Sequence, residues 1–230
     1  MTLLIFASCS DGFVIVSDRK QTYDLNLGAE FTKCLLSGNG DFFIALSGIN
    51  NLPKVLLDRL NSNSINSQNI ELEIKSIIDN YFNVESHNIA VDSSIHGFLV
   101  VKTDGVYKLK EIEAIGQVPT FSENDYVPVI YIGDMKAQLF AKHFLQNINL
   151  REMACEDASK YIVATMMEVS KSIKTISDET LGYDIVRFLN SGTISRRMRF
   201  TDSDIASLDI KFDINSDKKV FSDSEEVGTS

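Results

Sequence analysis

The chain has 230 residues, of which 44% are hydrophobic, so it is long enough to bury the core of one domain. Its formal net charge of −10, without a basic block or a basic–aromatic stripe, argues against a nucleic-acid partner. Three cysteines, an odd number without metal-ligand spacing, favour a reducing compartment and predict no metal site. No apolar run approaches 18 residues and no charged leader precedes a signal-length stretch, which predicts a cytoplasmic protein without a membrane partner.

Four short apolar runs in the first fifty residues predict strands. They lie at residues 3–7, 13–16, 33–36 and 42–46. Ser10-Asp11-Gly12 separates the first pair and Gly38-Asn39-Gly40 the second, and both are turn signals that predict hairpins. The runs are apolar on both faces, which is typical of a sheet covered on each side.

Helical spacing follows, then strands, then helices again. Residues 52–60 and 70–81 each carry an apolar face with helical spacing, separated by an Asn- and Ser-rich loop at 61–69. Strands are expected at 97–101, 106–109 and 129–132, with a turn at Thr103-Asp104-Gly105. Two further helices at 137–144 and 158–173 precede a strand at 185–189 and a last apolar stretch that ends near residue 214.

This order of segregated strands and helices predicts an α+β fold, with two central antiparallel sheets and helices outside them. The expected architecture is a four-layer αββα sandwich. Residues 1–215 form the predicted domain, and the acidic residues 216–230 form a predicted disordered tail.

Thr2 is the most informative residue for function, because Met1 is readily trimmed when a small residue follows it. A terminal Thr carries a hydroxyl nucleophile and a free α-amine on one residue. That amine has an ordinary pKa of about 7.7–8.0, so it can act as the base at neutral pH. The usual base, His, is not placed for this role: His87, His96 and His143 lie beside no Ser or Cys in a known catalytic pattern.

Several motifs carry a family resemblance. They are Thr2-Leu3-Leu4-Ile5, Asp11-Gly12, Ser17-Asp18-Arg19-Lys20-Gln21-Thr22, Phe31-Thr32-Lys33-Cys34 and Ala45-Leu46-Ser47-Gly48. Later matches are Ile132-Gly133-Asp134, Met153-Ala154-Cys155-Glu156-Asp157-Ala158 and Asp178-Glu179-Thr180-Leu181-Gly182. Over residues 2–190 the chain resembles a proteasome β-type subunit of the N-terminal-nucleophile hydrolase superfamily, which implies that superfamily's sandwich fold.

The resemblance implies a role for each matching residue. Thr2 is the nucleophile, Lys33 favours its alkoxide, and Asp18 orients Lys33. The amide of Gly48 donates to the oxyanion, a contact worth about 2.7–4 kcal/mol. The remaining implied residues are Asp134 and Asp178 near the terminal amine, the main chains of Thr22 and Gly48 along an extended substrate, and Gln21, Leu46 and Asn50 in the first specificity pocket.

The implied function is a threonine-type endopeptidase or amidase that cleaves unfolded polypeptide without a metal or an organic cofactor. Homo- or hetero-oligomeric rings are implied with it, capped by α-type subunits or an ATP-driven AAA+ unfoldase. Asp134 and Leu181 stand where the family has Ser, and this favours the alternative of an inactive β-like subunit that serves ring assembly. A stand-alone N-terminal-nucleophile amidohydrolase that acts on a small amide is the third interpretation.

Overall fold

The computed structural model describes most of the first 200 residues. The described residues are 2–23, 27–30, 33–48, 52–62, 65, 68–85, 94–116, 118–123, 127–173, 176, 182–197, 200 and 205. The predicted tail at 216–230 and the last predicted apolar stretch, from 206 onward, lie outside them.

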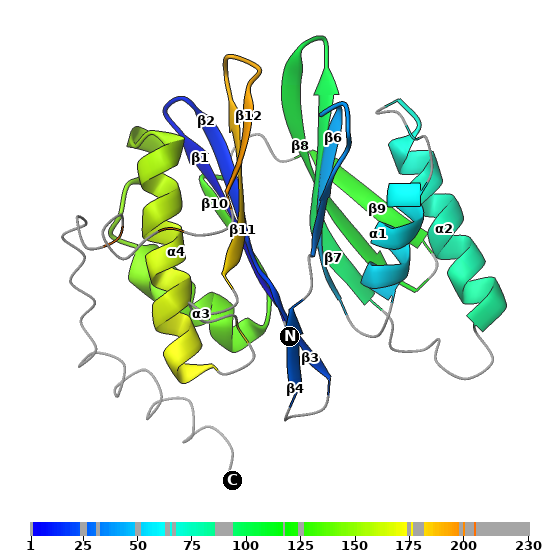
Figure 1. Cartoon of the computed structure of the whole chain (residues 1–230), viewed down its shortest axis with the longest axis horizontal. Helices are drawn as coiled ribbons and strands as arrows, with labels where there is room; N and C mark the ends of the chain where they lie inside the picture. Colours follow the sequence, from blue (N-terminus) through cyan, green and yellow to red (C-terminus); the bar gives the residue numbers. More distant parts are fainter. Residues whose placement is uncertain are drawn as a thin grey trace, which may run out of the picture.

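Two five-stranded antiparallel sheets form the centre of the molecule (Figure 1). The first sheet has the order β10-β1-β2-β11-β12. Its strands are β1 Leu3–Cys9, β2 Gly12–Asp18, β10 Val129–Gly133, β11 Tyr183–Leu189 and β12 Ile194–Arg197. The second has the order β5-β6-β7-β8-β9, and its strands are β5 Cys34–Leu36, β6 Phe42–Gly48, β7 Ser94–Thr103, β8 Val106–Ile115 and β9 Val118–Glu123.

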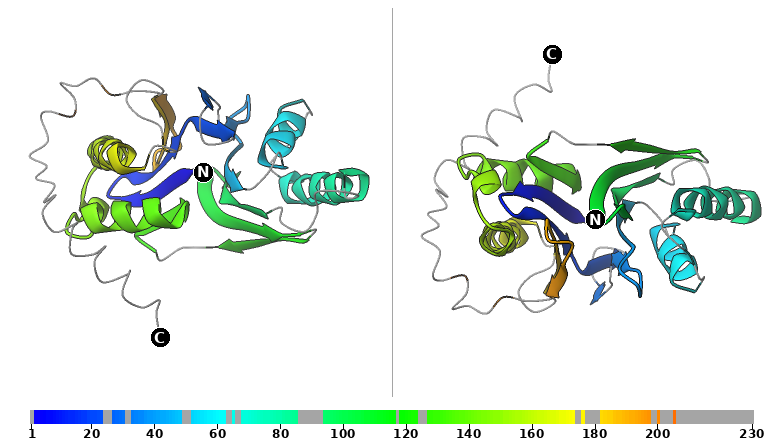
Figure 2. Two further views of the ribbon diagram at one scale, coloured as in Figure 1. Left: turned by 90° about the horizontal axis from the view of Figure 1, so that it is seen from below. Right: turned by 90° about the horizontal axis from the view of Figure 1, so that it is seen from above.

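Two helices cover the outer face of each sheet (Figures 1 and 2). Helices α3 (Met135–Leu145) and α4 (Cys155–Ser172) pack on the first sheet, and a short 3-10 helix, η1 (Leu150–Glu152), connects them. Helices α1 (Leu52–Ser62) and α2 (Ile70–Glu85) pack on the second sheet. The predicted four-layer αββα sandwich of two antiparallel sheets is therefore confirmed.

The alternation of side chains along each strand explains why the strands are apolar on both faces. On β1, Leu4 and Phe6 point into the core between the sheets, whereas Leu3 and Ile5 point to the core beneath α3 and α4. All four are at most 3% exposed. Each such side chain contributes about 1.5–3 kcal/mol when it leaves water, so neither face of a central strand tolerates a polar run.

Both predicted N-terminal hairpins are present, as is the hairpin formed by β7 and β8. Asp104 and Gly105 have φ values of 52° and 83°, which suit a two-residue hairpin turn. The sequence did not predict β9, β12 or the small hairpin of β3 (Lys20–Tyr23) and β4 (Leu27–Glu30). These segments have few apolar side chains, so main-chain pairing with a neighbouring strand decides their conformation.

No helix among the described residues is both long enough and apolar enough to cross a membrane.

Candidate functional site

Thr2 lies at the start of a central strand, immediately before β1, and is 7% exposed. Its carbonyl oxygen accepts a hydrogen bond from the amide of Asp134 at 2.9 Å. On the same side, Leu3 pairs with Gly133 at the end of β10. The main chain of Thr2 is thus held by the segment that leads into α3.

Gly133 allows this close approach. Its φ is 125°, and a Cβ atom there would lie 1.8 Å from the Thr2 carbonyl oxygen. No side chain fits at that distance without displacing one of the two strands. A glycine at this position is therefore required for the observed placement of Thr2.

Changing Gly133 to Ala should lower the free energy of unfolding by about 1–3 kcal/mol more than changing Gly116 to Ala, because overpacking is added to backbone strain. Gly116 is a matched control, since its φ of 75° is also positive but nothing lies within 4 Å of its missing Cβ. Urea unfolding of both variants measures the difference. Equal losses would contradict the close contact with Thr2.

A buried ion pair lies beside the peptide unit of Thr2. The ammonium of Lys33 donates to Asp18 Oδ1 at 2.7 Å and to Oδ2 at 2.8 Å. The amide of Leu3, which is bonded to the Thr2 carbonyl carbon, donates to the same Oδ1 atom at 2.8 Å. Asp18 is 0% and Lys33 5% exposed, so the two charges interact with little screening.

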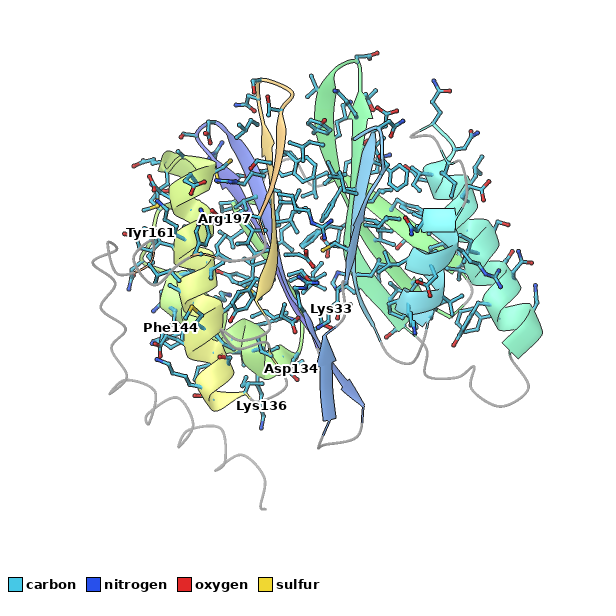
Figure 3. The ribbon with its side chains drawn as sticks, in the orientation of Figure 1. Lys33, Asp134, Lys136, Phe144, Tyr161 and Arg197 are labelled. Carbon is cyan, nitrogen blue, oxygen red and sulfur yellow. The ribbon has the colours of Figure 1, made fainter. Side chains whose placement is uncertain are left out.

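The ion pair joins the two sheets. Asp18 ends β2 in the first sheet, and Lys33 immediately precedes β5 in the second. Figure 3 shows Lys33 between the sheets and Asp134 at the start of α3, toward the same end of the sandwich. The sequence separations among Thr2, Asp18 and Lys33 follow from the lengths of the strands that meet at this end.

Burial lowers the pKa of Lys33 from its ordinary value of 10.5, and the charge of Asp18 offsets this only in part. Between that lowered pKa and 10.5, the unfolded chain binds more protons at Lys33 than the folded chain does. The contribution of Lys33 to stability therefore increases as the pH rises through this window.

We expect the free energy of unfolding of the wild type to rise relative to that of Lys33→Met as the pH increases toward 10.5, the ordinary pKa of a lysine. Urea unfolding of both proteins at a series of pH values measures the difference. A difference that falls over this range would show that the pKa of Lys33 is raised on folding.

Gly48 lies at the same end of the second sheet as Lys33. The carbonyl of Lys33 accepts from the amide of Leu46 at 2.9 Å, and Gly48 ends β6 two residues later, paired with Ile95. A Cβ atom on Gly48 would lie 2.3 Å from the Ser94 carbonyl oxygen, so this position too needs glycine. The side chain of Leu46 is 1% exposed and packs in the core beneath α1 and α2.

Asp134 is the N-cap residue of α3. Its Oδ1 atom accepts from the amide of Ala137 at 3.0 Å, which satisfies a donor in the first turn of the helix. Its amide holds Thr2, so the main chain and the side chain of Asp134 have different partners. The structure thus brings together Thr2, Asp18, Lys33 and Asp134, with Gly48 at the same end of the neighbouring sheet.

The other predicted site residues are only partly described. Gln21 and Thr22 lie in β3, and their side chains are outside the described set, whereas Asn50, Asp178 and Leu181 are outside it entirely. Within the described part of the chain, no group of three or more His, Cys, Asp or Glu residues is arranged to hold a metal ion.

The sequence analysis missed one buried charge near this end, Asp184 in β11, which is 1% exposed. The sequence indicates this residue only as a single carboxylate directly before the strand predicted at 185–189. A charged residue in a central strand is rare unless it is paired.

Known proteins resemble this chain in structure. No family model and no curated protein matches the sequence. Anbu from Hyphomicrobium sp. strain MC1 superposes with a TM-score of 0.62 at 11% identity, covering 100% of this chain and 99% of that chain. The chain has the Anbu fold. Anbu (ancestral β-subunit) from Yersinia bercovieri gives a TM-score of 0.64 at 15% identity, and the helical assembly of the Anbu complex from Pseudomonas aeruginosa gives 0.62 at 13%, each covering 100% of this chain and 98% of the other.

These matches correct the resemblance to a proteasome β-type subunit, which is wrong. The matched structures are described as Anbu, and one of them as an ancestral β-subunit, not as proteasome β-type subunits. The motif spacing misleads because two hairpins and their connection set the positions of Thr2, Asp18 and Lys33. Any chain that forms the same two hairpins would place these residues at similar separations, so the spacing indicates the fold better than the family.

Proposed function

We propose that this chain hydrolyses amide bonds of polypeptides, with the hydroxyl of Thr2 as nucleophile once Met1 has been removed. One observation carries the proposal: the Lys33 ammonium and the Leu3 amide converge on a single oxygen of Asp18. A buried positive charge is thereby held beside the peptide unit of Thr2, where it favours the alkoxide.

The proposed reaction has two steps. The free α-amine of Thr2 takes the hydroxyl proton while Oγ1 attacks the substrate carbonyl carbon, and the proton then passes to the leaving amine as the C–N bond breaks. Water next attacks the resulting ester, its proton is taken by the same α-amine, and the acid product leaves. The proton returns to Thr2 Oγ1, so no redox change and no cofactor are needed.

The supporting residues keep the roles that the sequence analysis assigned to them. In the proposal the Gly48 amide donates to the oxyanion, and the main chains of Thr22 and Gly48 bind the substrate as an added strand. Gln21, Leu46 and Asn50 keep their proposed place at the first specificity pocket. In the proposal Asp134 and Asp178 belong near the terminal amine, and the main-chain amide of Asp134 also donates to the Thr2 carbonyl.

We further propose that copies of this chain assemble with one another in the cytoplasm and act on unfolded polypeptide. One of the Anbu structures is described as a helical assembly, which supports self-assembly. The three cysteines of this chain are free thiols, which suits the reducing cytoplasm. Native mass spectrometry tests the assembly, for which a monomer at every protein concentration would be the contrary result.

An inactive assembly subunit is the rival interpretation. It is favoured by Asp134, whose Oδ1 is engaged by the amide of Ala137 in the cap of α3. A carboxylate occupied in this way is less suited to orient a terminal amine than a serine hydroxyl would be.

The decisive experiment compares two chains that differ at one end only. The first is the chain without Met1, verified by intact mass, and the second carries one additional residue ahead of Thr2. Both are incubated with fluorogenic peptide amides and with a denatured protein. The first should hydrolyse them, and the second should be inactive because its Thr2 nitrogen is an amide and cannot act as a base. Equal turnover, or none in either chain, would refute the proposal.

A further inference from the structure

The peptide unit between Gly133 and Asp134 has a hydrogen bond on each side. Its carbonyl oxygen, that of Gly133, accepts from Gln138 Nε2 at 2.8 Å. Its amide, that of Asp134, donates to the carbonyl oxygen of Thr2 at 2.9 Å. Gln138 is therefore connected to the main chain of the candidate nucleophile through a single peptide unit.

The position of Gln138 in α3 explains this contact. The helix begins at Met135 with Asp134 as its N-cap, so Gln138 lies one turn into it. Side chains of a helix lean toward its N-terminus, which lets Gln138 reach back over the first turn to Gly133. A carbonyl oxygen can only accept, so the side-chain amide of Gln138 has to present its nitrogen there. The side chain is thus a donor with a fixed orientation.

The same series of hydrogen bonds continues beyond Thr2 to the buried ion pair. The peptide unit between Thr2 and Leu3 also has both of its polar groups engaged. Its carbonyl accepts from the amide of Asp134, and its amide donates to Asp18 Oδ1 at 2.8 Å. Hydrogen bonds in series polarise one another, and the charge of the buried carboxylate strengthens them. Gln138 is the donor at the opposite end of this series from Asp18.

Gly133 is the reason why this peptide unit needs a restraint. Its φ of 125° lies in a region that glycine adopts readily, so its torsion angles are restrained less than those of other residues. Because a peptide unit is planar, a rotation that moves the Gly133 carbonyl also turns the Asp134 amide away from Thr2. The pairing of β1 with β10 ends at Leu3 and Gly133, so this unit lies just beyond the last pair of the ladder. Gln138 fixes the carbonyl and thereby the direction of the amide.

We propose that Gln138 is a positioning residue that holds Thr2 in place by fixing the peptide unit between Gly133 and Asp134. As a contribution to catalysis this rests on the proposed function, but as a restraint on Thr2 it does not. Displacement of a catalytic group by about 1 Å can cost about 100-fold in rate. Loosening the peptide unit that holds the nucleophile should therefore remove a measurable part of the activity.

Two substitutions of Gln138 in the full-length chain without Met1 test the hydrogen bond. Gln138→Met keeps the length of the side chain and places a methyl group where the donor nitrogen stood. Gln138→Arg places its Nε–H donor the same number of bonds from the main chain, so it restores the hydrogen bond. Gln146→Met is the matched control, because Gln146 is the C-cap residue of the same helix and its side chain lies near His143.

The first readout is hydrogen exchange resolved to single amides, which does not depend on activity. In each sample the Asp134 amide is compared with the Lys102 amide, which donates to the Asp41 carbonyl at 2.8 Å in the second sheet. We expect the Asp134 amide to exchange about tenfold faster in Gln138→Met, because one hydrogen bond is lost, and near the wild-type rate in Gln138→Arg and Gln146→Met. An unchanged rate in Gln138→Met would overturn the proposal. So would an equal acceleration of the Lys102 amide, or a Gln138→Arg variant that behaves like Gln138→Met.

The second readout is steady-state hydrolysis of a peptide amide. A positioning role predicts that kcat falls about tenfold in Gln138→Met while KM stays within about twofold, and that Gln138→Arg recovers most of kcat. A rise in KM at unchanged kcat would contradict it. If the wild type hydrolyses nothing, the proposed function fails, and the exchange rates still decide whether Gln138 restrains the peptide unit that holds Thr2. Should Gln138→Met not fold, Gln138→Glu, which keeps the shape of Gln and lacks the donor, takes its place in both readouts.

Discussion

Replacing Asp18 by Asn is expected to lower the free energy of unfolding by about 3–5 kcal/mol, because it leaves a buried ammonium without its anion. Lys33 is 5% exposed and donates to both oxygens of this carboxylate. The amide of Leu3 shares one of these oxygens, so the start of β1 loses its charged acceptor as well. Urea unfolding at neutral pH measures the loss.

A double-mutant cycle with Lys33→Met separates the ion pair from its surroundings. We expect the double variant Asp18→Asn/Lys33→Met to be more stable than the sum of the two single losses predicts, because no unpaired charge remains buried. Lys160→Met is the control for an exposed pair, since its 2.9 Å contact with Asp157 lies at the surface and should contribute less than about 1 kcal/mol. Strict additivity of the two buried substitutions would contradict the coupling.

The fold was predictable because its strands and helices differ clearly in pattern. Doubly apolar runs such as 3–7 and 42–46 can be stable only in a sheet covered on both faces, and the turns at Ser10-Asp11-Gly12 and Asp104-Gly105 fixed which strands pair. Strand β12 escaped prediction, because Ile194–Arg197 is largely polar and depends on pairing with β11. Helix α2 also extends beyond the predicted end, to Glu85.

The predicted candidate residues that the structure brings together all come from the first fifty residues and from the Gly133-Asp134 turn. Thr2, Asp18 and Lys33 are separated along the chain, yet Asp18 is hydrogen-bonded both to Lys33 and to the residue after Thr2. Asp184 could not be found in this way, because its partners Arg19 and Arg196 are brought beside it only by the fold. The family was misjudged for a similar reason, since spacing reflects the sandwich that several families share.

The largest effect on activity is expected from Thr2→Ala, which should reduce kcat/KM for a peptide amide by at least about 10⁴-fold. The variant removes the hydroxyl and keeps the α-amine, because Met1 is also trimmed ahead of Ala. The structure should be preserved, since the hydrogen bond from Asp134 to residue 2 uses the carbonyl oxygen. The free energy of unfolding should therefore change by less than about 1 kcal/mol.

Thr2→Ser provides the matched comparison, because it restores a hydroxyl and lacks only a methyl group. We expect it to retain activity within about tenfold of the wild type, since the nucleophile, the α-amine and the Lys33 ammonium are all present. Intact mass must show the same terminus for all three proteins. If Thr2→Ala were as active as the wild type, the nucleophile would have to be another residue. If Thr2→Ser were as inactive as Thr2→Ala despite a correct terminus, the hydroxyl at residue 2 would not be sufficient, and the buried Lys33–Asp18 pair would have to be explained by the stability of the sheet interface alone.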